Sequence, residues 1–228
     1  MFKLKELKIP KDEVLRYLGY KKQGIDEALN NLIDETIEEC KTLISPKFIH
    51  ATYNTIIGED GVRLEGTNLL LPGNDIREHL KNAGKTVLMA VTLGGNIQTK
   101  IVFYEKINLT KALIMDSCAT TVVEEICDML EEYIKEEALN EGLSITFRYS
   151  PGYGDLPITI QKDFLKTLNA DKRIGLTASE SHLLLPRKSV TAIIGLIPKT
   201  EEVKKRNCAV CSNYKNCSFR REGIRCGS

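Results

Sequence analysis

One segment, from Thr110 to about Asn140, limits the possible folds of this 228-residue chain more than any other. Its apolar residues recur at intervals of three and four, and no other segment of the sequence is as periodic. That spacing is typical of one face of an α-helix. Gly142 follows and is a typical helix stop. We therefore predict a single long helix that ends near this glycine.

Shorter helices and strands are predicted on both sides of that segment. Helical spacing and helix start or stop signals lie at 11–18, 25–43, 74–84 with Asn74 as N-cap, after the glycine turn at 94–95, and at 160–168. Runs rich in β-branched, aromatic or apolar residues predict strands at 48–57, 62–71 with a break at Gly66, 86–93, 143–149, 173–177 and 190–197. Because these elements interleave without regular βαβ units, we predict a mixed α+β domain.

The charge balance gives no reason to expect nucleic acid as a partner. Lysine and arginine number 32 against 31 acidic residues, a formal net charge of +1. No run reaches about 18 apolar residues, so neither a transmembrane helix nor a membrane partner is expected. The first residues lack the apolar run of a signal peptide. We therefore expect a reducing, cytoplasmic location, in which stable disulfides among the seven cysteines are not expected.

The loop RYSPGYGDLP, residues Arg148 to Pro157, is the most informative short segment. A predicted strand ends at the Arg148 guanidinium, which can hold a carboxylate through two parallel hydrogen bonds. Pro151 fixes the backbone, Gly152 permits a close approach, and Tyr153 offers a ring and a hydroxyl group. These residues suit a small polar ligand with a carboxylate and a flat base. An ordinary turn is the alternative, because Pro-Gly pairs favour turns.

Two carboxylates of the long predicted helix, Asp116 and Glu124, are candidate ligand contacts. They are eight residues apart and therefore share one helix face. A carboxylate that faces a pocket could hold a ligand ammonium group or a ribose hydroxyl. The alternative is that both are solvated charges on an amphipathic helix.

The composition changes near Lys199, and a cysteine-rich tail follows. We place a boundary there, between a domain at 1–200 and a tail at 201–228. The tail contains four cysteines within 19 residues, two of them in a CxxC motif: Cys208, Cys211, Cys217 and Cys226. Four thiolates at this spacing suit zinc or an iron–sulfur cluster, and the sequence does not distinguish the two. Redox-active thiols or cysteines that bind no metal are the alternatives.

The other cysteines and the histidines suggest no further site. Cys40, Cys118 and Cys127 lie in helical patterns and are predicted to be core thiols. No pair of the three histidines has metal-ligand spacing. The motifs GxGxxG, GxSxG, the P-loop and the cobalamin-binding DxHxxG are absent. The usual nucleotide and hydrolase sites are therefore excluded, and we predict no catalytic residue.

Four segments in order, between Lys85 and Leu196, resemble the activation domain of cobalamin-dependent methionine synthase. The RxxxGY motif of that family is similar to RYSPGY here, with Arg148, Gly152 and Tyr153 at its fixed positions. The other three segments are AVTLGG at 90–95, the helix segment that begins KAL at 111–113 and contains Asp116, Ala119 and Glu124, and ESHLLLPRKSV at 180–190.

The resemblance implies a bent mixed or antiparallel sheet with flanking helices. It also implies that S-adenosylmethionine lies along the surface. Arg148 would bind the ligand carboxylate, and the Tyr153 ring would pack on the ligand. Backbone groups near Ser150 and Gly152 would contact the ligand. The remaining implied ligand-binding residues are Asp116 and Glu124.

In the family this domain docks over a cobalamin domain and restores cofactor that has oxidised to inactive cob(II)alamin. An electron donor such as flavodoxin or ferredoxin reduces the cobalt, and S-adenosylmethionine then methylates it. We expect no homocysteine, folate or cobalamin domain in this 228-residue chain. The resemblance therefore implies a stand-alone module that reactivates a cobalamin-binding methyltransferase, methionine synthase foremost, in trans.

The sequence departs from the family at several points, and two other functions stay open. GDLP follows the GY pair where the family has a cysteine-containing stretch, and Leu185 stands where the family has tryptophan. The cysteine-rich tail is not part of the long enzyme, and we expect it to hold a redox cluster or to dock the partner. One alternative is an autonomous S-adenosylmethionine-dependent methyltransferase. The other is a metal-binding interaction protein whose ligand site has decayed.

Overall fold

A computed structural model describes residues 7–20 and 23–200 of the chain. These residues form two compact units, and neither is continuous in sequence. The first unit takes the described residues of 1–49, 90–133 and 168–190. The second takes those of 50–89, 134–167 and 191–228. The predicted boundary near residue 200 stays a prediction, because the tail lies outside the described residues.

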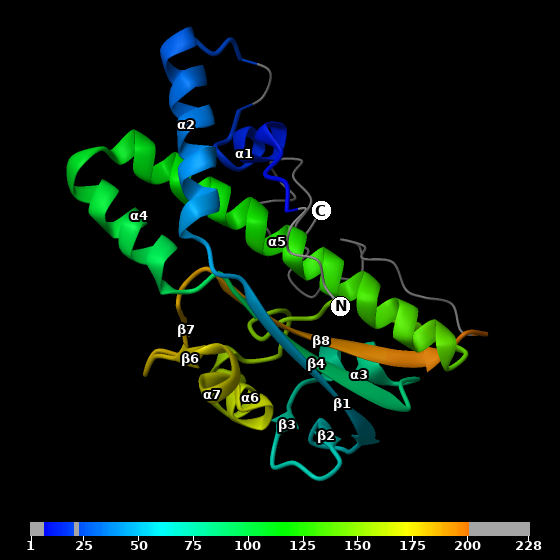
Figure 1. Cartoon of the computed structure of the whole chain (residues 1–228). Helices are drawn as coiled ribbons and strands as arrows, with labels where there is room; N and C mark the ends of the chain where they lie inside the picture. Colours follow the sequence, from blue (N-terminus) through cyan, green and yellow to red (C-terminus); the bar gives the residue numbers. More distant parts are fainter. Residues whose placement is uncertain (1–6, 21–22, 201–228) are drawn as a thin grey trace. The chain divides into compact units, whose positions relative to one another are not determined.

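Helices and strands are interspersed along the described residues (Figure 1). The helices are α1 (Lys11–Tyr17), α2 (Glu27–Leu43), α3 (Asn74–Leu80), α4 (Gly95–Ile107), α5 (Leu109–Asn140), α6 (Gln161–Leu168) and α7 (Ala170–Ile174), with a 3-10 turn η2 at Ile158–Ile160. The strands are β1 (Lys47–Ile57), β2 (Val62–Leu64), β3 (Leu70–Leu71), β4 (Lys85–Thr92), β5 (Leu143–Ile145), β6 (Thr177–Ala178), β7 (Leu184–Leu185) and β8 (Ser189–Pro198). No helix in these ranges is long and apolar enough to cross a membrane.

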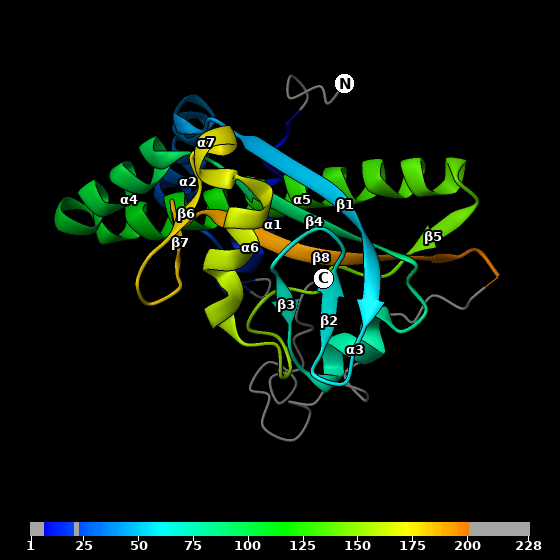
Figure 2. The ribbon, with the colours of Figure 1, turned by 90° about the horizontal axis from the view of Figure 1, so that it is seen from below.

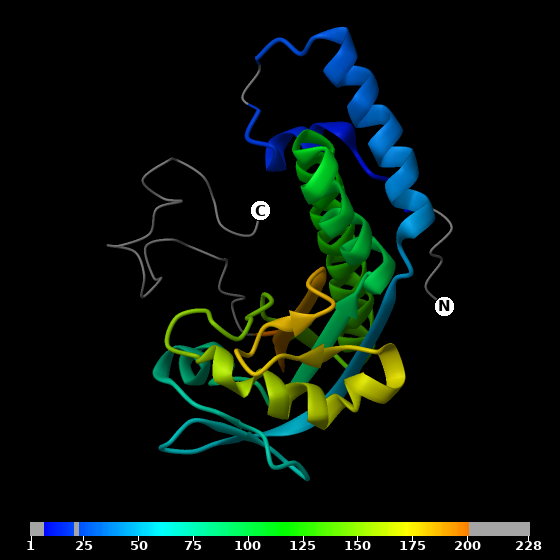
Figure 3. The same ribbon diagram turned by 90° about the vertical axis from the view of Figure 1, so that its left-hand side faces the viewer.

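The first unit is mainly helical. Its α2 packs against both α1 and α4, and the first three-quarters of α5 belong to the same unit (Figure 3). The Asp26 side chain begins α2 by accepting a hydrogen bond from the Leu29 amide at 2.7 Å. The predicted core thiols are confirmed, since Cys40, Cys118 and Cys127 are all fully buried here.

The second unit is built on a six-stranded sheet in the order β3-β2-β1-β4-β8-β5 (Figure 2). β1 pairs with β2, β2 with β3 and β5 with β8, each in an antiparallel register. Helices flank both faces of this sheet. A Cβ on Gly195 of β8 would lie 2.9 Å from Leu80 of α3, whereas the next residue, Leu196, faces the end of α5. The predicted α+β class, with a mostly antiparallel sheet and flanking helices, is confirmed.

Three local predictions differ from the structure. Gly73 is the N-cap of α3, and Asn74 is its first helical residue. The strand predicted at 143–149 ends at Ile145, and only an isolated bridge continues it at Tyr149. The strand predicted at 173–177 is wrong, because α7 continues to Ile174 and β6 begins only at Thr177. The buried α7 residues Ala170 and Ile174 are four apart and therefore lie on one helix face.

A partly buried cluster of charged side chains joins three helices of the first unit. The Glu39 carboxylate of α2 lies 3.0 Å from the Lys100 ammonium of α4 and 2.8 Å from the Lys111 ammonium of α5. The Tyr104 hydroxyl donates to it at 2.8 Å. Burial on its own would raise the pKa of Glu39, but the hydrogen bonds from Lys111, Lys100 and Tyr104 lower it to about 2. The cluster therefore stabilises the fold only while Glu39 is ionised.

Replacement of Glu39 by glutamine should lower the free energy of unfolding at pH 7 by about 1–3 kcal/mol, because two ammonium groups lose their carboxylate. The pKa of Glu39 is lower in the folded state than in the unfolded state, where it is near 4.5. The stabilisation from the cluster is therefore complete above pH 4.5 and is lost as the pH falls towards about 2. Urea titrations of wild type and variant should therefore converge at acidic pH. Glu38→Gln is the matched control, because the exposed Glu38–Lys41 pair should contribute less than about 1 kcal/mol.

Candidate functional site

The loop that follows β5 in the second unit is fixed at its base by β8. The Tyr149 amide donates to the Ile193 carbonyl at 2.9 Å, and the Ile193 amide donates back at 2.8 Å. Arg148 directly precedes this bridge and is half-buried, with its Nη1 atom fully buried. The guanidinium is thus held at the point where the loop leaves the sheet.

Internal hydrogen bonds close the loop on itself. The Gly152 amide donates to the Leu156 carbonyl at 2.8 Å, and the Tyr153 amide donates to the Ser150 carbonyl at 3.0 Å. Gly152 has φ +94°, a conformation that side-chain-bearing residues rarely adopt. Backbone groups near Ser150 and Gly152 were predicted to contact the ligand. Two of them, the Ser150 carbonyl and the Gly152 amide, already have hydrogen-bond partners within the loop.

Asp155 ties the loop to the start of α3. Its carboxylate accepts hydrogen bonds from the amides of Asn74 at 2.6 Å and Asp75 at 3.1 Å. At Gly154, with φ +53°, an added Cβ would collide with the Asp75 carboxylate and the Tyr149 hydroxyl. The GDLP stretch therefore has a structural role here. Asp155 was not among the predicted site residues, although aspartate is a typical helix-capping residue.

Aromatic rings support the loop from the side of α3. The His79 ring packs against Phe147 and Tyr149, with centroid distances of 4.5 and 5.0 Å. Tyr149 in turn meets Tyr153 edge to face at 6.0 Å. Tyr153 remains 48% exposed. It therefore presents a supported ring on which a flat ligand group could stack.

The two predicted carboxylates of α5 belong to the first unit, whereas the four predicted loop residues belong to the second. The Asp116 carboxylate lies 2.8 Å from the Lys188 ammonium, which also donates to the Thr120 hydroxyl at 2.8 Å. Asp116 is thus part of an ion pair. Glu124 is half-buried, and its charge adds to the rise that burial causes in the pKa of Tyr17.

Lys188 was not among the predicted site residues. It lies in the segment ESHLLLPRKSV, but its contact with α5 joins positions 68 residues apart. Only the fold brings these positions together.

The described ranges contain no group of three or more histidine, cysteine or acidic residues placed to hold a metal ion. The four cysteines predicted to bind zinc or an iron–sulfur cluster, Cys208, Cys211, Cys217 and Cys226, lie outside those ranges. That prediction is therefore not tested by the structure.

Comparison with known proteins identifies the fold. No family model and no curated protein matches the sequence. A crystal structure of the MetH reactivation domain bound to AdoHcy superposes with a TM-score of 0.58 at 16% identity, covering 92% of this chain and 76% of the other. An FMN-dependent nitroreductase from Clostridium difficile R20291 aligns at a TM-score of only 0.21, too low to indicate a shared fold. The chain therefore has the fold of the reactivation domain, as the sequence resemblance predicted.

The Asp155 contact predicts a specific loss of stability. In Asp155→Ala, the amides of Asn74 and Asp75 lose their acceptor, so the free energy of unfolding should fall by about 0.5–2 kcal/mol. Urea denaturation measures this change. Asp163→Ala removes an exposed carboxylate from the same unit and should change stability by less than about 0.5 kcal/mol. Equal effects of the two substitutions would contradict the capping role.

Proposed function

We propose that this chain binds S-adenosylmethionine at the loop of residues 148–157. The observation that carries the proposal is the combination of the reactivation-domain fold with an RxxxGY motif on an anchored surface loop. Arg148 would hold the ligand carboxylate through charge-assisted hydrogen bonds. The exposed ring of Tyr153 would pack on the ligand.

We further propose that the chain acts in trans on a cobalamin-binding methyltransferase. The neighbouring fold is that of a reactivation domain, which supports a partner of this class. An electron from a donor such as flavodoxin or ferredoxin would first reduce the partner's cob(II)alamin. The methyl group would then leave the sulfonium for the reduced cobalt. The S–CH3 electron pair would stay on sulfur, and the Co–CH3 bond would form from the cobalt electron pair.

The contribution of this chain to that transfer would be placement. Its task is to hold the sulfonium methyl near the partner's cobalt, and proximity of this kind can supply much of a rate enhancement. The positive charge of the methyl donor makes the neutral thioether a good leaving group. No base or nucleophile of this chain is required for the step.

Asp116 and Glu124 keep their predicted roles as proposals. Because Asp116 is paired with Lys188, a ligand ammonium group would have to compete with that lysine. The proposed metal site at the four tail cysteines would be tested by metal analysis and by the visible spectrum of anaerobically purified protein. An iron–sulfur cluster would absorb in the visible range, whereas zinc would not.

Titration calorimetry with S-adenosylmethionine tests the ligand site. Wild type should bind saturably, and Arg148→Ala should weaken binding by about 10- to 100-fold, as expected for loss of a charged hydrogen-bond donor. Tyr153→Ala should weaken binding about fivefold through loss of stacking. Tyr133→Ala, which removes an exposed ring of α5, should leave the affinity unchanged. Equal binding by all four proteins would place the ligand elsewhere.

Reactivation in trans has its own assay. The chain would be mixed with a methionine synthase lacking its own reactivation domain, cob(II)alamin, reduced flavodoxin and S-adenosylmethionine. Methylcobalamin should form, and its rate of formation should fall at least tenfold with Arg148→Ala at subsaturating S-adenosylmethionine, about 1.4 kcal/mol in transition-state terms. If the chain binds the ligand but leaves the cobalamin spectrum unchanged, ligand binding would stand and this partner would be rejected.

A further inference from the structure

Exposed apolar side chains surround the turn between α4 and α5 in the first unit (Figure 1). On α4, Phe103 and Ile107 are four residues apart and therefore share a helix face. On α5, Leu109 and Leu113 have the same spacing. Only Asn108 separates the two helices, so Ile107 and Leu109 are neighbours across the turn. We call this surface the exposed strip, and its five members are 39–63% exposed: Val102, Phe103, Ile107, Leu109 and Leu113.

Helix α4 carries apolar residues on two opposite faces. Ile97, Ile101 and Tyr104 are buried within the first unit. By helical periodicity, Val102 and Phe103 point away from that face, and both are exposed. A helix that is apolar all round is normally buried on all sides. The described residues supply no cover for the outward face of α4.

The area of the exposed strip matches one side of a homodimer interface. Single exposed apolar residues are normal on a protein surface, but here five lie within residues 102–113. At roughly 200 Å² of accessible surface for a large apolar side chain, the strip exposes on the order of 500 Å². A stable interface buries about 800 Å² on each partner, and about 65% of that area is apolar between two copies of one chain. The strip therefore supplies the apolar area that one copy needs.

The charges beside the exposed strip are self-complementary. Glu105 and Lys106 lie three and four residues after Val102 and therefore flank it on the next turn of α4. Both are exposed, and neither has an ion-pair partner within residues 7–20 and 23–200. A two-fold axis beside this pair would place Glu105 of one copy against Lys106 of the other, and the reverse. Interfaces that form and separate are less apolar than this strip, so its composition favours a second copy over a transient partner.

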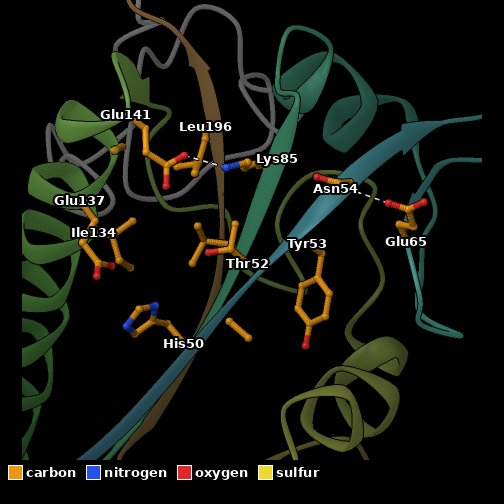
Figure 4. Close-up of a pocket in the computed structure, with 13 residues that line it drawn as sticks. His50, Thr52, Tyr53, Asn54, Glu65, Lys85, Ile134, Glu137, Glu141 and Leu196 are labelled. Atoms are coloured by element: carbon orange, nitrogen blue, oxygen red, sulfur yellow. Dashed lines mark hydrogen bonds and ion pairs between the residues drawn. The ribbon is translucent and has the colours of Figure 1, made fainter.

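A hollow of about 600 Å³ between β1 and the end of α5 presents no comparable apolar surface (Figure 4). The Lys85 ammonium lies 2.6 Å from the Glu141 carboxylate. The Asn54 amide donates to the Glu65 carboxylate at 2.7 Å. The larger apolar residues of the lining and Ala138 are at most 6% exposed: Val87, Ile134, Ala138 and Leu196. The exposed strip, by contrast, presents its apolar side chains to solvent.

We propose that two copies of this chain form a two-fold symmetric dimer through the exposed strip. The apolar side chains of one copy pack against those of the other. Two ion pairs between Glu105 and Lys106 flank this contact. The strip shares no residue with the proposed S-adenosylmethionine site, so the two proposals can fail separately.

Sedimentation velocity of the full chain at micromolar concentrations tests the proposal. Wild type should sediment as a dimer. Ile107→Lys and Leu109→Lys should each raise the dimer dissociation constant at least about 30-fold, because each buries an ammonium group without a partner. Leu139→Lys is the matched control, since it places the same charge at another exposed leucine of α5 and should leave the constant unchanged.

A charge exchange tests the two-fold symmetry. Lys106→Glu should raise the dissociation constant about fivefold, because carboxylates then face each other across the axis. Addition of Glu105→Lys to that variant should restore the wild-type constant to within about twofold, because each carboxylate again meets an ammonium group.

Thermal unfolding of each variant verifies that it is folded, and lysine at the exposed positions 107 and 109 should be tolerated. Wild type that stays monomeric at micromolar concentrations would overturn the proposal. A dimer that survives both Ile107→Lys and Leu109→Lys would also overturn it, because that dimer uses another surface. Monomeric wild type that binds phosphatidylcholine vesicles, with binding lost in Ile107→Lys, would assign the strip to a lipid surface instead.

Discussion

The apolar stripe of α5 is the constraint on which both units depend. The helix runs for 32 residues, about 48 Å at a rise of ~1.5 Å per residue. In the first unit it buries Met115, Cys118 and Val122, and in the second it buries Ile134 and Ala138. Each unit therefore takes part of its core from the same helix. A polar residue at any of these positions would be costly, because the surrounding side chains offer it few hydrogen-bond partners.

The candidate loop shows how local contacts hold a stretch that departs from the pattern of the family that the sequence resembles. Residues 154–157 differ from the family's sequence, yet Asp155 anchors them to α3 and Gly154 permits the approach. The same anchoring leaves Tyr153 exposed while Tyr149 supports it from below. The loop is thus held by backbone pairing on one side and by a helix terminus on the other. Such support favours a defined binding geometry.

Local patterns were sufficient to predict most elements and the fold class. The long helix, the pair of short strands after Gly58 and the buried strand at 85–92 all have strong periodicity or composition. The helix α7 was missed because its last two residues begin a stretch, 173–177, that alternates in a strand-like way. Burial of Ala170 and Ile174 on one helix face decides between helix and strand. Local propensity carries no information on such tertiary burial.

The candidate site was predictable only in its local part. Arg148 and Tyr153 lie in one short motif, so sequence reasoning could find them. The contacts of Asp155 with α3 and of Lys188 with Asp116 join residues 81 and 72 positions apart. No motif marks either pairing. Pairings of this kind follow from topology, which single-sequence patterns do not specify.

Burial determines the chemistry of the three cysteines in the described part of the chain. Burial raises the pKa of the Cys40 thiol to about 12, with a further contribution from the nearby Glu39 carboxylate. Burial likewise raises the pKa of Cys118 to about 12, and Cys127 is fully enclosed. Because the thiolate is the reactive form, these three are nearly inert at neutral pH. A thiol-specific probe applied to the folded chain would therefore gain almost no signal from these three core positions.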